Sequence, residues 1–483
     1  MNREDSNIPL ISAIQQHFKR EPISFHVPGH KNGKLFHSSL MEDFKDIHKY
    51  DVTELEGLDD LHHPTGVILE AQELCASFYQ AKESVFLVGG STAGNLAMVH
   101  GLTEASDQIL IQRNSHKSLF HAIELFQVEP IFLKPELEKE TGHPLGPSLT
   151  TIEEAIDHFP EAKVLFLTYP NYYGASFEIK ALIDKAHEAG LIVCVDEAHG
   201  AHFALGDPFP PSALQLGADI VVQSAHKMLP ALTMGSYLHF HPSLAKEKVE
   251  LVKHSLAMLQ SSSPSYLIMA ALDGARAYIE QLNEENINEM IAGVQSFIDE
   301  IATIPQLEVI KRSHSSYSQD PLKVTIKSCT KLSGFELQDL LFKEGIDVEL
   351  ADHKHVLFVF GLGDYTDTSY LALKLRGLLS EYNVINEEVN IVSSTDKITQ
   401  LSIPSHQVKK YSYKVCSIDK AVGHIAAEEI VPYPPGIPLV FKGEVLKDSV
   451  MKDIVRLHES GAVFQGNNPL IDGLKVVDLE EIK

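Results

Sequence analysis

The stretch "DIVVQSAHKMLPALTMGS", Asp219–Ser236, decides the fold. A short apolar run is followed at once by the polar residues Ser224, His226 and Lys227, after which apolar sequence resumes. The apolar neighbours of the lysine are Val221, Val222, Met228 and Leu229. A lysine at the end of a buried strand is costly to keep charged, so its amine tends to be neutral and nucleophilic or bonded to another group. The stretch therefore predicts a strand of an α/β sheet that ends in a reactive lysine.

Similar short apolar runs recur on the N-terminal side of this stretch, between about Ala81 and Phe240. The runs that we interpret as strands are "SVFLVGG", "QILIQ", "EPIFLK", "KVLFLTYP" and "LIVCVDEAHG". Amphipathic segments typical of helices, such as "SLFHAIELF" and "LIDKAHEAG", lie between several of them. This alternation predicts a doubly wound, mainly parallel α/β sheet. In such sheets ligands bind at the carboxyl ends of the strands, so polar clusters at those ends are candidate sites.

The pattern changes from about Pro305 onward. The segments that resemble strands are "PLKVTIKS", "IDVELA" and "VLFVFG", and those that resemble helices are "FELQDLLFKEG" and "SYLALKLRGLLSEY". This pattern predicts a smaller α+β domain. A polar connection, "SSTDKITQLSIPSHQVKKYSYK", leads to "AEEIVPYPPGIPLVFKGE", whose prolines exclude a helix. We therefore expect an N-terminal arm and segment (residues 1–80), a large domain (81–304), a small α+β domain (305–385) and a C-terminal domain with the PYPPGIP segment (386–483).

Composition limits the class of protein and its partners. The chain has 483 residues, of which 44% are hydrophobic and 22% charged, as in soluble globular proteins of two or three domains. Its net charge is −26, from 40 Lys and Arg against 66 Asp and Glu. Such a surface repels nucleic-acid phosphates and anionic lipids and attracts cations, so we expect neither a nucleic-acid nor a membrane partner.

Cysteine spacing and hydropathy indicate a reducing compartment. The four cysteines form no CxxC pair, so neither a disulfide framework nor a structural zinc site is expected. No apolar run approaches the roughly 20 residues that span a bilayer, and the N-terminal sequence lacks the apolar stretch of a secretory signal. We therefore expect a cytoplasmic protein. The cysteines, expected to be reduced and buried, are Cys75, Cys194, Cys329 and Cys416.

Two further polar clusters follow strand-like runs. "GGSTAGN" offers backbone N–H groups and the hydroxyls of Ser91 and Thr92 to an anion at a helix start, but it lacks the lysine of a Walker loop. "VCVDEAHGAH" resembles a helicase box in its letters, yet no GxxxxGK[ST] loop accompanies it, which excludes a helicase. It contains Glu197, His199 and His202 without a further ligand at a recognisable spacing, so we predict no metal site.

Taken together, these clusters supply the groups that hold pyridoxal phosphate. Lys227 can form a Schiff base with the aldehyde, Asp196 can pair with the pyridine nitrogen, and hydroxyls can bind the phosphate. A flat group is needed to stack on the ring, and His116 in "RNSHKSLF" follows another strand. Each group alone is ambiguous, but their order on one α/β domain predicts a site for this cofactor.

The sequence resembles the ornithine/lysine/arginine decarboxylases of the aspartate-aminotransferase fold (fold type I), in their short bacterial form. The motifs that carry the resemblance are "FHVPGHKNG", "DVTELEGLDDLHHPTG", "GGSTAGN", "RNSHKS", "TYPNYYG", "DEAHG", "SAHK", "SSSPSY" and "PYPPGIPLVFKGE". The resemblance implies that Lys227 binds the cofactor, Asp196 pairs with its ring nitrogen, His116 stacks on the ring and His199 lies near ring and substrate. The implied phosphate donors are Ser91, Thr92, Ser224, His226 and, from the neighbouring subunit of a homodimer, Ser261.

The activity implied by the resemblance is decarboxylation of arginine, lysine or ornithine, which feeds polyamine metabolism. Glu428 and Glu429 are candidates for binding the distal cation of the substrate. The chain departs from many relatives at Asn171 and His424, and the choice of amino acid stays open. An aminotransferase uses the same cofactor but needs an arginine for the substrate carboxylate, for which Arg376 is available. A non-catalytic cofactor-binding paralogue is the other alternative, against which the presence of both Lys227 and Asp196 argues.

Overall fold

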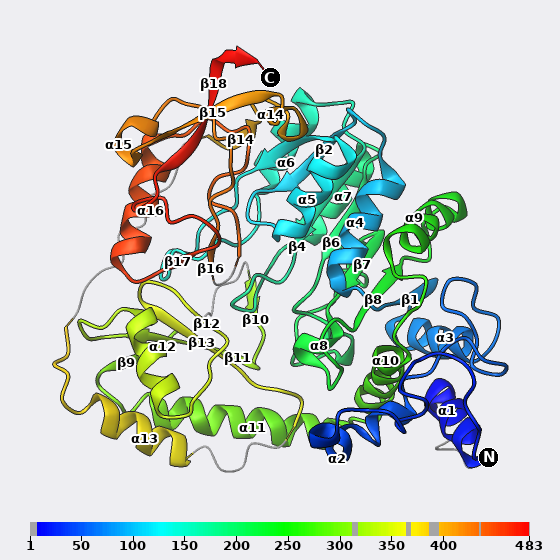
Figure 1. Ribbon diagram of the computed structural model, residues 1–483. Helices are drawn as coiled ribbons and strands as arrows, with labels where there is room; N and C mark the ends of the chain where they lie inside the picture. Colours follow the sequence, from blue (N-terminus) through cyan, green and yellow to red (C-terminus); the bar gives the residue numbers. More distant parts are fainter. Residues whose placement is uncertain (1–6, 312–316, 364–368, 386–395, 434–435, 483) are drawn as a thin grey trace. The chain divides into compact units, whose positions relative to one another are not determined.

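The computed structural model describes residues 7–311, 317–363, 369–385, 396–433 and 436–482 (Figure 1). The chain folds into two compact units. Unit 1 comprises the chain up to Leu102 together with Val193–Asn283, and unit 2 comprises Thr103–Ile192 and the chain from Glu284 onward. The four-domain division expected from the sequence stays a prediction.

Unit 1 contains strands in the order β1-β8-β7-β6. β8 is antiparallel to both of its neighbours, whereas β6 and β7 are parallel. β7 and β8 are buried along their whole length, as the apolar runs in the sequence predict. The strand bounds are β1 Glu83–Leu87, β6 Ile192–Asp196, β7 Ile220–Gln223 and β8 Ser236–Phe240.

The helices of unit 1 include two that directly follow strands, α4 after β1 and α8 after β7 (Figure 1). Gly94 lets α4 approach β7 closely, because a Cβ at this position would lie 2.7 Å from Val222 Cγ2 and 2.9 Å from Leu87 Cδ1. The bounds are α1 Pro9–Lys19, α2 Met41–Phe44, α3 Val67–Tyr79, α4 Gly90–Leu102, α8 Ala225–Met228, α9 Lys246–Leu259 and α10 Tyr266–Glu280. Short 3₁₀ turns cover Ser38–Leu40, Ile47–Lys49 and Phe203–Leu205.

A fully buried ion pair ties α1 to α10. Arg276 Nη2 lies 2.9 Å from Asp273 Oδ1, and both side chains are inaccessible to solvent. Asp273 also accepts a hydrogen bond from the backbone N–H of Leu10, and Arg276 donates to the side chain of Asn7. Burial raises the pKa of Asp273 to about 6, against the opposing effect of Arg276. The hydrogen bonds from this pair to Leu10 and Asn7 hold the N-terminal helix on α10, and removal of one partner from such a buried pair typically costs about 3–5 kcal/mol.

Unit 2 contains strands in the order β4-β2-β3-β14. β2 is parallel to β3 and β4, and β14 is antiparallel to β3. The segment expected to be a polar connection thus contains a strand, because the edge of β3 offers backbone groups that Ile398 and its neighbours satisfy. The bounds are β2 Gln108–Gln112, β3 Glu129–Leu133, β4 Val164–Thr168, β14 Ile398–Gln400, α5 Lys117–Phe126, α6 Leu149–His158, α7 Lys180–Glu188 and α14 Ser405–Val408.

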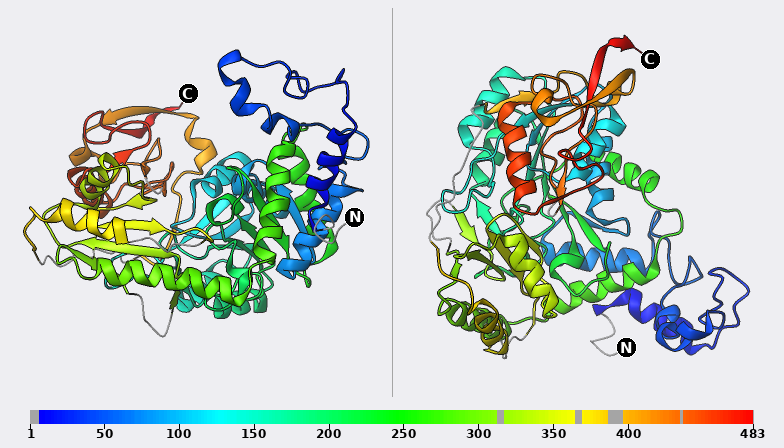
Figure 2. Two further views of the ribbon diagram at one scale, coloured as in Figure 1. Left: turned by 90° about the horizontal axis from the view of Figure 1, so that it is seen from below. Right: turned by 60° about the vertical axis from the view of Figure 1, so that its left-hand side comes forward.

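The α+β region expected from about Pro305 forms a sheet in the order β12-β13-β11-β9. The long helix α11 packs against β9 and α13 (Figure 2). A two-stranded sheet pairs β10 with β5. The bounds are β5 Ala175–Phe177, α11 Glu284–Ile301, β9 Leu307–Val309, β10 Tyr317–Gln319, β11 Lys323–Ser328, α12 Gly334–Lys343, β12 Leu350–Ala351, β13 His355–Val359 and α13 Ser369–Leu379.

The C-terminal region has its own small core, in which Ile454 and Val476 are fully buried. β15 pairs with β18 and β16 with β17. The proline-rich tail contains β16 and no helix where it is described, as expected, and Pro434–Pro435 lie outside the described residues. In the described part of the chain, no helix combines the length and apolar character needed to cross a membrane. The bounds are β15 Tyr411–Cys416, α15 Ile418–Ala421, β16 Pro432–Tyr433, α16 Asp448–Glu459, β17 Val463–Phe464 and β18 Leu474–Ile482.

All four cysteines are free thiols. Cys75 and Cys194 are buried as expected, whereas Cys329 and Cys416 are only half-buried. Burial raises the pKa of the Cys75 thiol, which keeps it protonated and unreactive.

Candidate active site

The first site element is the start of α4, where the chain turns sharply from β1. Gly90 has a φ of +73°, a conformation that glycine adopts without strain, and its N–H donates to Met234 O at 2.9 Å. Ser91 and Thr92 then fall in the first turn of a 13-residue helix. Ser91 is half-buried and Thr92 is exposed. Free backbone N–H groups and the helix dipole make this position favourable for an anion.

The short helix α8 brings two further predicted residues to the same place. Ser224 Oγ donates to Ser91 Oγ at 2.8 Å, so hydroxyls from two distant motifs converge. His226 lies in α8 with Nδ1 3.0 Å from Gly235 O. Burial lowers the pKa of His226, as does the nearby Lys227. This neutral imidazole anchors α8 to the segment that precedes β8.

Lys227 lies in α8 and its Nζ is 3.0 Å from His199 Nε2. The apolar neighbours of the lysine are buried, but Lys227 itself is half-buried. The prediction that the strand ends in this lysine is therefore wrong in detail. β7 ends at Gln223, and the lysine lies in the helical turn that follows. In this turn Met228 is buried in the core, whereas the neighbouring Lys227 lies on a different side of the helix. The amine is positioned by an imidazole rather than by complete burial.

Asp196 is the last residue of β6 and is only 4% exposed. Its carboxylate accepts hydrogen bonds from Asn95 Nδ2 at 2.8 Å and from the N–H of Ala198 at 3.1 Å. β6 and β7 are parallel with Asp196 opposite Val222, so the carboxylate and α8 lie at the carboxyl ends of adjacent strands. Unit 1 thus brings Asp196, Lys227, His199 and the two serines to one edge of its sheet.

Glu197 is a structural residue of this edge that the sequence reasoning considered only as a metal ligand. It is fully buried and accepts hydrogen bonds from Ser212 Oγ, the N–H of Ala213 and Gln223 Nε2. The signal in the sequence that could have indicated this structural role is the position of Glu197 directly after Asp196 at the end of an apolar run. Because Gln223 directly precedes Ser224, Glu197 fixes the end of β7 against the end of β6.

This carboxyl belongs to a longer buried polar chain across unit 1. His239 Nε2 lies 3.0 Å from Gln223 Oε1, and His239 Nδ1 lies 2.7 Å from Ser84 Oγ. Burial lowers the pKa of His239 to about 3, so the imidazole is neutral and one ring nitrogen donates while the other accepts. The chain therefore links β1, β8, β7 and the end of β6 beneath the site.

Glu197 should make stability depend on pH. Burial raises its pKa from 4.5 to about 8, so the folded state holds a proton that the unfolded state releases between these pH values. The contribution of Glu197 to the free energy of unfolding is thus fully present below about pH 4.5. It is lost as pH rises through 8, and the free energy of unfolding falls by up to about 1.4 kcal/mol per pH unit. We expect the difference in unfolding midpoint between wild type and Glu197→Gln to narrow or reverse from pH 5 to 8. A difference that is constant with pH would contradict a titrating Glu197.

The remaining two predicted cofactor residues lie apart from this group in the chain. His116 belongs to unit 2, where it is the N-cap residue of α5 and accepts from the N–H of Ser118. Ser261 lies in unit 1 between α9 and α10, and it is exposed. Its Oγ accepts from the N–H of Ser263 at 3.2 Å, and its carbonyl lies 2.7 Å from His62 Nε2. The stacking role of His116 and the phosphate role of Ser261 stay predictions.

The residues considered for substrate specificity have structural contacts of their own. Asn171 is buried and accepts from the N–H groups of Tyr173 and Ala175, so it shapes the turn after β4. Glu428 pairs with Lys475 at 2.9 Å, whereas burial raises the pKa of Glu429. A carboxylate already paired with a lysine is a weak candidate for binding a substrate cation.

The donors of unit 1 fit pyridoxal phosphate. Two converging hydroxyls at the start of a long helix suit a phosphate, a positioned amine suits an aldehyde, and a buried carboxylate suits a protonated ring nitrogen. The Cβ contacts of Gly94 show why a side chain there would move the start of α4 away from these groups.

Comparisons with known proteins identify the family of the chain. The model for "Orn/Lys/Arg decarboxylase, major domain" matches residues 8–317, and the model for the C-terminal domain of that family matches residues 398–481. The chain is 44% identical to the Bacillus subtilis (strain 168) protein YaaO, over 99% of this chain and 100% of that protein. It is 32% identical to the arginine decarboxylase of the same strain, over 95% of each chain.

A solved structure of similar fold is the Francisella novicida lysine decarboxylase LdcF, with a TM-score of 0.82 and 20% sequence identity. The match covers 98% of this chain and 81% of that structure. The predicted α/β architecture of fold type I is thereby confirmed. With a family model over most of the chain and full-length relatives above 30% identity, the chain belongs to the Orn/Lys/Arg decarboxylase family of enzymes.

Proposed function

We propose that this enzyme decarboxylates a basic amino acid with pyridoxal phosphate as its cofactor, and that arginine is the substrate. One observation carries the proposal. The Lys227 amine lies 3.0 Å from His199 Nε2 on helix α8, and α8 follows strand β7, which pairs with the strand that ends at Asp196. The choice of arginine is supported by full-length relatives named arginine decarboxylase at 31–32% identity. Lysine and ornithine are the competing substrates.

Each residue of the edge has a role in this proposal. Lys227 attaches the cofactor, Asp196 keeps the ring nitrogen protonated, and Ser91, Thr92, Ser224 and His226 bind the phosphate. When bound, pyridoxal phosphate supplies a ring that accepts the electrons left as CO2 departs. Asn95 holds the Asp196 carboxylate in place at 2.8 Å, which limits its freedom to rotate away from the ring.

The proton that replaces CO2 must come from a positioned acid. Lys227 and His199 share a hydrogen bond, so a proton held at Nζ or Nε2 can pass between them. His199 is 6% exposed, which excludes bulk water from most of its ring. We assign the two residues together as the proton donor to the substrate α-carbon.

A direct assay tests the substrate. The purified enzyme, loaded with cofactor, is incubated separately with arginine, lysine and ornithine, and the amine products are identified by mass spectrometry while released CO2 is counted. We expect one amine per CO2 and the highest kcat/KM with arginine. A higher kcat/KM with lysine or ornithine would overturn the choice of arginine, and keto-acid formation without CO2 would indicate the aminotransferase alternative.

We further propose that the enzyme works in the cytoplasm, in polyamine biosynthesis, as a homodimer or an assembly of dimers. Unit 1 exposes a run of large apolar side chains between α1 and α3, of which Phe25 is 93% exposed. Such side chains favour burial in an interface. The exposed residues of this run are Ile23, Phe25, Val27, Leu35, Phe36, Leu40, Phe44 and Ile47.

Shared sites can be tested with hybrid dimers. If Ser261 reaches the phosphate of the partner subunit, Lys227→Ala chains mixed with Ser261→Ala chains form one site with both residues intact. We expect the mixture to regain part of the activity that each variant lacks, and dilution to dissociation should release cofactor and activity together. Heterodimers without regained activity, or a fully active monomer in sedimentation, would contradict the shared site.

A further inference from the structure

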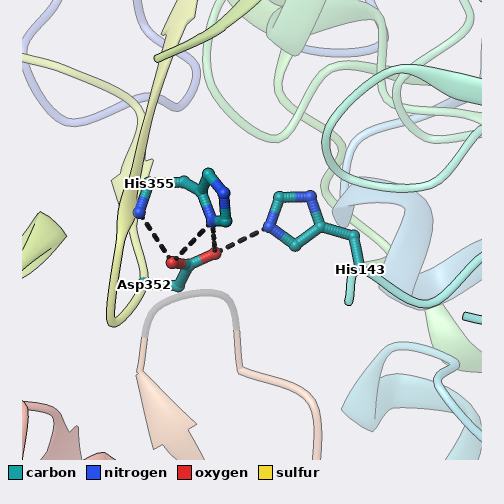
Figure 3. Close-up of side chains that lie close together, drawn as sticks. All are labelled: His143, Asp352 and His355. Carbon is teal, nitrogen blue, oxygen red and sulfur yellow. Dashed lines mark hydrogen bonds and ion pairs between the residues drawn. The ribbon is translucent and has the colours of Figure 1, made fainter. Parts of the chain in front are cut away.

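A compact group of two histidines and one aspartate lies in unit 2 (Figure 3). Asp352 lies in the turn between β12 and β13, and His355 is the first residue of β13. His143 comes from the loop that precedes α6. His143 Nε2 is 2.7 Å from Asp352 Oδ2, and His355 Nδ1 is 3.1 Å from each carboxylate oxygen. Each of the three side chains offers one ligand atom, and these atoms all lie within 4.8 Å of one another.

The backbone of this group is held rigidly. The N–H groups of Lys354 and His355 both donate to Asp352 Oδ1 at 2.8 Å. Gly334, the first residue of α12, packs so closely that a Cβ there would lie 2.3 Å from the carbonyl oxygens of both Asp352 and His355. A tight turn locked from two sides keeps the aspartate and the histidine in their relative positions. Such preorganisation lowers the conformational cost of binding a small ion.

The neighbours of the group are those that commonly surround a bound metal. Glu138 Oε2 lies 3.8 Å from His143 Nδ1, the ring nitrogen on the other side from Asp352, and Glu138 is 2% exposed. At 3.8 Å the two atoms form no hydrogen bond, but a small approach would let this carboxylate accept from the Nδ1–H group and so orient a histidine ligand. Tyr173 donates to Asp352 Oδ2 at 2.8 Å and stacks on His143 with ring centroids 3.4 Å apart. These contacts fix the ring plane of His143.

The distances suit a transition-metal ion. Zinc bonds of about 2.0–2.1 Å in a tetrahedral arrangement separate the ligand atoms by about 3.3 Å. The observed separations of 2.7 and 3.1 Å from the carboxylate need to widen by a few tenths of an ångström. The two imidazole nitrogens lie within 4.8 Å of each other and need to come to about 3.3 Å. Two imidazoles and one carboxylate form a ligand set preferred by zinc over magnesium or calcium, which favour all-oxygen sites.

The group is also accessible. His143, Asp352 and Tyr173 line a cavity of about 700 Å³ within unit 2, whose other walls are largely apolar. A three-ligand ion at this wall keeps coordination positions open toward the cavity, as zinc ions in catalytic sites do. The net charge of −26 adds a general attraction for cations.

We propose that His143, Asp352 and His355 form a binding site for a divalent transition-metal ion of the zinc class, with open coordination toward the cavity. The site consists of unit 2 residues, whereas Asp196 and Lys227 belong to unit 1. The proposal departs from the prediction of no metal site, which was made for Glu197, His199 and His202. His143 and Asp352 are 209 residues apart, so no local spacing reveals them.

Zinc titration of the cofactor-loaded enzyme tests the proposal. After removal of metals with a chelator, zinc is titrated in competition with a chromophoric chelator. We expect one ion per chain at micromolar affinity or tighter. Asp352→Asn keeps the shape of the side chain but removes the charged ligand, and it should weaken binding by more than about 100-fold, since loss of a supporting residue alone costs about 10–100-fold. His143→Gln should have a similar effect.

Asp396→Asn is the matched control, because Asp396 lines the same cavity but pairs with Lys447 and lies outside the group. It should leave zinc affinity unchanged. Retained cofactor absorbance and circular dichroism would show that each variant is folded. On the wild-type enzyme, zinc-edge X-ray absorption should show two imidazole ligands and only nitrogen and oxygen neighbours. Equal zinc affinity in Asp352→Asn and Asp396→Asn, zinc loss on Lys227→Ala instead, or an absorption spectrum without imidazoles would overturn the proposal.

Discussion

Lys227→Ala is expected to give a colourless protein without measurable decarboxylation. The amine that attaches the cofactor is lost, and His199 loses the partner 3.0 Å away with which it shares a proton. Removal of a residue that performs the chemistry typically lowers kcat by about 10⁴-fold or more. Visible absorbance after dialysis measures the cofactor, and CO2 release measures kcat.

Borohydride reduction of the wild-type enzyme identifies the attachment point independently of activity. We expect the cofactor on the peptide that contains Lys227. Lys246→Ala, which removes an exposed lysine at the start of α9, is the matched control and should keep both colour and activity. A reduced adduct on Lys31 or Lys117 would overturn the assignment of Lys227.

Asp196→Asn is expected to retain cofactor but lose most activity. The hydroxyls of Ser91 and Ser224 and the lysine amine remain, so binding persists, whereas a neutral amide cannot hold a proton on the ring nitrogen. Loss of one such electrostatic contact costs about 10²–10³-fold in kcat. Absorbance measures whether the cofactor is retained, and CO2 release measures the loss of kcat. KM should change little.

The structural role of Asp196 must be distinguished from its chemical role. Asn95 donates to Asp196 at 2.8 Å, and an asparagine at position 196 can still accept through its amide oxygen. Asp184→Asn removes an exposed carboxylate that pairs with Lys180 and serves as the control without effect. A kcat for Asp196→Asn within a few-fold of wild type would show that Asp196 is not the partner of the ring nitrogen.

Local sequence patterns were sufficient to predict the buried strands and the residues at their ends. Asp196 and Ser224 each directly follow a short apolar run, and parallel strands necessarily bring such positions to one edge. The same patterns do not determine how far a side chain is buried. One turn of α8 leaves Lys227 only partly buried, which depends on how the helix docks and not on the neighbours of the lysine in sequence.

Contacts between distant segments could not be predicted in this way. β14 forms because the edge of β3 is available, although "DKITQ" by itself reads as a polar connection. Two pairs depend on the packing of whole segments. Glu428 pairs with Lys475, and His143 pairs with Asp352. Periodicity carries no information on such pairs, because it describes only how one segment faces the core.

The buried polar chain from Ser84 through His239 and Gln223 to Glu197 has an evolutionary consequence. Since His239 is neutral, its donor and acceptor nitrogens fix the orientation of the Gln223 amide, and each member satisfies the next. Replacement of His239 or Gln223 by an apolar residue leaves two other members without a partner, and replacement of Ser84 or Glu197 leaves one, at a cost of about 1–3 kcal/mol for each unpaired group. The four positions should therefore be inherited as a set, and sequences of relatives should change them together or not at all.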